Sequence, residues 1–101
     1  MPRLRFSGDQ IKVTDLSILK PQRNPEFISQ LLPDGYVLLY SERTNWTHTL
    51  TPLGGLVWEF CDGKDRAIEI AGTISSVSQV PVKEADVVQL ISEFQSKGLL
   101  A

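Results

Sequence analysis

The spacing of the apolar residues changes near residue 50 of this chain. Before that point, two apolar, β-favouring runs, EFISQLL (26–32) and YVLLYS (36–41), flank the tripeptide PDG. In a turn, proline presets φ, aspartate can bond the backbone ahead of it, and glycine tolerates a positive φ. The pattern therefore predicts a β-hairpin over residues 26–41.

A third strand is predicted after the polar connection ERTN. The run WTHTL (46–50) alternates large and small side chains, which places Trp46, His48 and Leu50 on one face and Thr47 and Thr49 on the other. A strand with this composition contains no charge, proline or glycine, so nothing in it blocks further pairing if it lies at a sheet edge.

The stretch LTPLGGLVWEFCDG (50–63) has the signals of one short helix. Thr51 is a suitable N-cap, Pro52 stands at the first helical position, and Asp62-Gly63 supplies a stop. Apolar residues at helical spacing predict a core-facing stripe of Leu53, Leu56, Val57 and Phe60. Two adjacent glycines, Gly54 and Gly55, are poor helix formers, which suggests that another backbone passes close by.

Two further helices are predicted by the same spacing. One begins after Asp65 and turns Ala67, Ile70, Ala71 and Ile74 inward; the other follows Pro81, turns Val87, Leu90, Ile91 and Phe94 inward, and ends in KGLL. The predicted order is three strands and then three helices, an α+β class. Residues 1–25 lack firm periodicity and are interpreted as an N-terminal arm, with one short strand through Ile11 and Val13 as an option; residues 26–101 form the domain.

Charge separates the arm from the domain. The 101 residues carry a net charge of −2, but residues 1–25 hold five Lys or Arg against two Asp, a net +3 that leaves the domain at −5. An acidic domain does not favour phosphate backbones. No apolar run approaches the ~18 residues of a membrane span, and there is no secretory signal, so we expect a cytosolic protein without membrane or nucleic-acid partners.

Catalytic and metal chemistry find little support in these residues. His48 is the single histidine and Cys61 the single cysteine, which is too few for a thiolate metal cluster or an evident nucleophile and base pair. We expect His48 to be a half-buried strand residue and Cys61 a small hydrophobe. Glu84, Asp86 and Glu93 are most simply a solvated helix face. We therefore predict no enzyme, no cofactor and no metal.

Two kinds of binding remain. The last two helices resemble a helix-turn-helix core, but the third carries a net −1, which disfavours DNA reading. The other is capture of an extended peptide on the third strand. Periodicity leaves open whether that strand binds a peptide, is central, or is covered by the arm through residues 11–14. An open edge would also permit a homodimer.

From about Glu26 to Ala101 the chain resembles the PqqD-like family, the RiPP recognition elements. The resemblance is carried by YVLLYSERTNWTHTLTPLGGLVWEFCDGKDRAIEIA and by VKEADVVQLISEFQSKGLL. It departs in Thr51, where an Asn is common, and in the longer N-terminal stretch. The resemblance implies a winged-helix-like domain that binds the leader peptide of a ribosomally made precursor and presents it to a modifying enzyme. A radical SAM maturase is the first choice for that enzyme and a leader peptidase the second, while a winged-helix regulator of DNA or protein is the alternative function.

The resemblance also implies a site. The leader would add as a strand to residues 46–50, in a cleft formed with the third helix. The implied site residues are Trp46, Thr47, His48, Thr49, Leu50, Asp86, Val87, Leu90, Ile91 and Phe94. The helical spacing of Val87, Leu90, Ile91 and Phe94 is equally explained by burial in the core.

Overall fold

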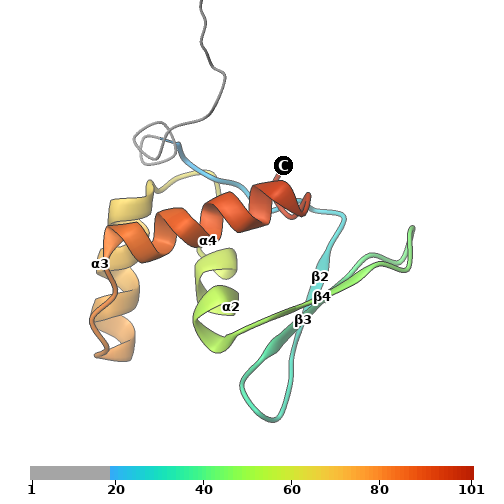
Figure 1. Ribbon diagram of the computed structural model, residues 1–101, viewed down its shortest axis with the longest axis horizontal. Coiled ribbons are helices and arrows are strands. Elements are labelled where there is room, and N and C mark those ends of the chain that lie inside the picture. Colours follow the sequence, from blue (N-terminus) through green and yellow to red (C-terminus); the bar gives the residue numbers. More distant parts are fainter. Residues whose placement is uncertain (1–18) are drawn as a thin grey trace, which may run out of the picture.

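A computed structural model describes residues 19–101, which form a three-stranded antiparallel sheet followed by three helices (Figure 1). The strands are β2 (Ile28–Leu31), β3 (Val37–Tyr40) and β4 (Thr47–Leu50), in the order β2-β3-β4. The predicted turn joins β2 to β3: Gly35 has φ +91° and the Asp34 carboxylate accepts the Tyr36 N–H at 3.1 Å. The predicted fold class is confirmed.

Helix α2 (Pro52–Glu59) begins as its sequence predicts and packs directly on the sheet. The Thr51 hydroxyl accepts the Gly54 N–H at 3.0 Å and Pro52 occupies the first turn. A Cβ built on Gly55 would lie 2.3 Å from Cγ2 of Val37 on β3. The close approach predicted for the glycines is thus real, but at Gly55 the neighbour is a side chain and not a backbone.

The buried face of α2 differs from the predicted stripe. Gly54, Gly55, Val57 and Trp58 are buried, whereas Leu56 is exposed and Leu53 and Phe60 are only half-buried. Because Gly54 and Gly55 have no side chains, the face of α2 that contains them can lie close to the sheet. The buried face therefore includes Trp58 and leaves Leu56 exposed. The Trp58 indole N–H is satisfied by the Leu99 carbonyl at 3.0 Å.

Helices α3 (Ala67–Ser78) and α4 (Glu84–Ser96) complete the core on the same side of the sheet as α2. The four predicted residues of α3 are buried; in α4, Val88 is buried where Leu90 was predicted. The end of α4 follows its sequence signal, with Gly98 at φ +73° and the Leu99 N–H bonded to the Phe94 carbonyl at 2.9 Å. No helix within residues 19–101 is long and apolar enough to cross a membrane.

The end of the predicted arm is part of the folded unit. The N–H of Arg23 bonds the Cys61 carbonyl at 2.7 Å and the N–H of Asn24 bonds the Leu99 carbonyl at 3.0 Å. These bonds insert residues 22–24 between the loop after α2 and the C-terminus, which lie together in Figure 1. Most of the predicted arm, including the optional strand through Ile11 and Val13, lies outside the described residues.

The contact between Gly55 and Val37 predicts opposite effects for two glycine-to-alanine changes. Gly55→Ala forces a Cβ into Val37, and we expect the free energy of unfolding to fall by about 1–3 kcal/mol. Gly72→Ala on α3 meets nothing within 4 Å, and its better helix propensity should raise that free energy by about 0.5–1 kcal/mol. Urea unfolding followed by circular dichroism measures both; equal effects of the two changes would contradict this packing account.

Candidate functional site

The outer edge of β4 is open among the described residues, and its hydrogen-bonding groups can be assigned. The Ser41 N–H bonds the Trp46 carbonyl at 2.9 Å, and the register continues through the pairs Leu39–His48 and Val37–Leu50. In an antiparallel ladder the hydrogen-bonded pairs alternate with non-bonded ones. The N–H and C=O groups of Thr47 and Thr49 therefore point away from β3, toward the open edge.

Side chains on the helix-facing side of β4 become more buried along the strand. Trp46, just before β4, is 64% exposed, His48 is half-buried and Leu50 is buried. Thr47 and Thr49 are exposed on the opposite face, as the alternation predicted. This side of the edge thus offers an exposed aromatic ring at one end and a closed apolar floor at the other.

His48 takes part in packing. Its ring meets Phe27 edge to face, with 5.8 Å between the ring centroids, and its Nε2 is buried without a hydrogen-bond partner among the described residues. This position matches the expected half-buried strand residue.

The predicted α4 residues divide into a surface pair and a buried trio. Val87, Ile91 and Phe94 are buried in the core, so they do not line the exposed face of α4 that would form the wall of the cleft. Leu90 is half-buried and lies over Gly54, 3.8 Å from the position of a Cβ there, close to Leu50. Asp86 is exposed, and its carboxylate caps α4 by accepting the Lys83 N–H at 3.1 Å.

Glu93 and Lys97 were not among the predicted site residues. They follow Leu90 by three and seven positions, which places them on the same face of the helix, and both are exposed.

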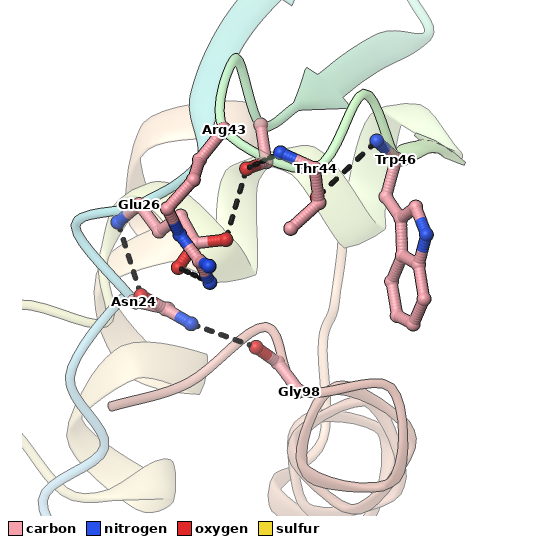
Figure 2. A network of polar contacts seen from close by, with 7 residues as sticks. Asn24, Glu26, Arg43, Thr44, Trp46 and Gly98 are labelled. Carbon is pink, nitrogen blue, oxygen red and sulfur yellow. Dashed lines mark hydrogen bonds and ion pairs between the residues drawn. The ribbon is translucent and has the colours of Figure 1, made fainter.

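A network of polar contacts fixes the β3–β4 hairpin beside the end of α4 (Figure 2). Glu26 accepts hydrogen bonds from Arg43 at 2.8 Å and from Ser41 at 2.9 Å, while Asn24 joins the Glu26 N–H to the Gly98 carbonyl. The Arg43 guanidinium, and then the Ser41 hydroxyl, hold the pKa of Glu26 below its usual value.

The network reaches the candidate site at Trp46. The Thr44 hydroxyl accepts the Trp46 N–H at 3.3 Å, and the indole ring extends from the hairpin on the side where Gly98 and α4 lie (Figure 2). The backbone of Trp46 is thereby held while its ring stays accessible.

Cys61 has the properties of a structural residue. It is buried, its thiol donates to the Val57 carbonyl at 3.1 Å, and burial raises the pKa of this thiol to about 12. Within residues 19–101, no group of three His, Cys, Asp or Glu is placed to hold a metal ion.

Comparisons with known proteins agree with the observed fold. The PqqD family, described as coenzyme PQQ synthesis protein D, matches residues 35–100. A solved structure of TbiB1 in complex with the TbiA(beta) leader peptide superposes with a TM-score of 0.58 at 20% identity, covering 78% of this chain and 93% of that chain. A search of curated proteins gives no match.

The lowered pKa of Glu26 predicts a pH-dependent contribution to stability. Folding favours the ionised form of the Glu26 carboxyl, so this group adds to the free energy of unfolding. That stabilisation is fully present above the ordinary pKa near 4.5, and it is lost as the pH falls through the lowered pKa of the folded state. We expect Glu26→Gln to be less stable than the wild type at pH 7, with the difference shrinking below pH 4.5.

Urea unfolding between pH 7 and pH 3 tests this expectation. Glu42→Gln, on the exposed side of the same hairpin, is the matched control and should track the wild type. A Glu26→Gln difference that stays constant with pH would show that the carboxylate charge plays no part.

Proposed function

This chain belongs to the PqqD family, and we propose that it binds the leader peptide of a ribosomally synthesised precursor as an added strand on β4 and presents it to a modifying enzyme. The observation that carries the proposal is the open β4 edge, where Thr47 and Thr49 turn their backbone groups outward on a strand without charge or proline. The leader-bound TbiB1 structure, which shares this fold, supports the choice of ligand.

Backbone pairing with β4 would supply affinity, and side chains would supply selectivity. In an added strand every second side chain points toward the helices, where Trp46 and Leu90 are accessible and Leu50 forms the floor. These contacts favour apolar leader residues at alternate positions. His48 lies between Trp46 and Leu50 on the same face and completes the strand platform.

Charged residues border the apolar part of the helix wall. Asp86 precedes Leu90, while Glu93 and Lys97 follow it on the same face. We infer that these side chains contact polar leader residues, and that Val87, Ile91 and Phe94 act from the core by holding α4 at the correct height above β4.

The protein's role would be recognition, with the chemistry performed by the partner enzyme. Its single histidine packs on Phe27, and the thiol of Cys61 is buried and protonated at neutral pH. Among partner enzymes a radical SAM maturase is favoured by the family resemblance, and a leader peptidase is the second choice.

A titration of the isotope-labelled protein with the leader encoded beside its gene tests the proposal. We expect amide shifts concentrated in residues 46–50 and 86–97, and no comparable shifts with duplex DNA. Shifts confined to residues elsewhere, or none in the folded protein, would refute leader binding on β4.

A proline on β4 should remove binding without unfolding the domain. Thr49→Pro deletes an N–H that points outward, so its bonding to β3 is not affected, and we expect leader affinity to fall by roughly tenfold or more. Ser29→Pro is the matched control, because it deletes an outward N–H on the opposite edge, at β2. Isothermal titration calorimetry measures the leader affinity of both variants. Equal losses of affinity in the two variants would argue against β4 as the docking strand.

Trp46 should contribute to affinity without contributing to stability. Because its ring is 64% exposed, Trp46→Ala should change the free energy of unfolding by no more than about 0.5 kcal/mol, while leader affinity falls roughly tenfold. Val77→Ala, at an apolar side chain 70% exposed on α3, is the control and should leave leader affinity unchanged. Wild-type affinity in Trp46→Ala would remove the indole from the site.

A further inference from the structure

The sheet has a second open edge among the described residues, on β2, and the residues of β2 whose backbone groups point outward can be assigned. The Leu32 N–H bonds the Tyr36 carbonyl at 2.8 Å, so in the continuing register Gln30 and Ile28 bond β3. Ser29 and Leu31 therefore point their backbone groups outward. No described residue pairs with this side of β2, and its sequence ISQL contains no charge or proline.

An apolar cavity lies next to this edge. It has a volume of about 320 Å³ and lies between the helix-facing side of β2 and β3 and α2, with Leu31, Val37, Pro52, Gly55 and Leu56 in its wall. Ser29 and Glu59 also line it, and the Glu59 carboxylate accepts the Ser29 hydroxyl at 2.9 Å. A cavity of about 150 Å³ already holds a benzene-sized ligand, so this one is large enough for a leucine side chain. Leu31 stands at its border and is 73% exposed.

We propose that two copies of this chain pair through their β2 strands, antiparallel about a two-fold axis at Gln30, with Leu31 of each copy entering the cavity of the other. Such a pairing sets Ser29 opposite the partner's Leu31, and both residues have outward backbone groups, so the hydrogen-bond phases match. Ser29 borders the cavity, so the partner's Leu31 would project beside the cavity on the correct face of the sheet.

The second copy fits this surface because the surface carries both halves of the contact. Each copy supplies an exposed leucine and an apolar cavity that can receive one, which is the self-complementarity that a two-fold interface needs. On β4 the residues with outward backbone groups are Thr47 and Thr49, and neither carries an apolar side chain that could enter a partner's cavity as Leu31 can. The dimer would join two sheets into one of six strands and leave both β4 edges free, so it is independent of leader binding.

Analytical ultracentrifugation of the full chain tests the dimer. We expect the apparent mass to rise with concentration from 11.3 kDa toward twice that value. Leu31→Lys should weaken association by roughly a hundredfold, because two leucines lose their burial. Val77→Lys, at an equally exposed position on α3, should associate like the wild type.

A disulfide across the axis gives a second, independent measurement. Gln30 of one copy would lie opposite Gln30 of the other as a non-hydrogen-bonded pair. In such a pair the two Cα atoms lie about 4.5 Å apart, which is within the range that a disulfide spans. Gln30→Cys should therefore oxidise to a covalent dimer, while Gln89→Cys on the exposed side of α4 should not; the buried Cys61 does not compete.

Two results would overturn the proposal. One is a chain that stays monomeric at every concentration and forms no Gln30→Cys dimer. The other is a dimer that survives Leu31→Lys but is lost in Thr49→Pro, since association would then use β4. Because leader affinity is measured separately in the same variants, failure of the dimer and failure of leader binding are distinguishable.

Discussion

The contact between Gly55 on α2 and Val37 on β3 sets the geometry on which the rest of this domain depends. Because a glycine faces the valine, the helix lies directly on the sheet, and any larger side chain would have to push the two apart. The same seating buries Trp58, whose indole N–H bonds the carbonyl of Leu99 after α4. Gly55 therefore allows the close approach of α2 to the sheet, and Trp58 on the same helix links α2 to the segment after α4.

A three-stranded sheet covered by helices on one side keeps two edges, and within residues 19–101 neither edge strand contains a charge or a proline. The surroundings distinguish them. Beside β4 stand the exposed ring of Trp46 and the α4 wall at Leu90, a surface suited to an extended peptide with apolar side chains. Beside β2 there is an apolar cavity with the exposed Leu31 at its border. The two edges expose the same kind of backbone groups and differ in the side chains around them.

The β4 edge also needs a fixed hairpin. Glu26 joins Ser41 and Arg43, and Asn24 ties this group to Gly98 at the end of α4 (Figure 2). These residues come from three separated parts of the chain, so the strand that would receive a peptide is positioned relative to the helix that would form its wall. No local sequence motif predicts such a network, because its side chains are ordinary polar residues in connecting segments and its last acceptor is the backbone carbonyl of Gly98.

The sequence by itself determined the elements, since turn, cap and stop signals are local: the turn at Pro33–Gly35, the cap at Thr51 and the left-handed Gly98 are all as predicted. It also determined the faces of β4, because alternation has a period of two. Tertiary structure decided which apolar residues remain accessible. Helical spacing assigns Leu90 and Ile91 alike to the core, yet Leu90 reaches the surface over Gly54 while Ile91 is buried, because that outcome depends on how closely α2 approaches. For the same reason Trp58 replaced Leu56 in the core: the contact face of a helix follows from the partner that it meets, which its own periodicity does not specify.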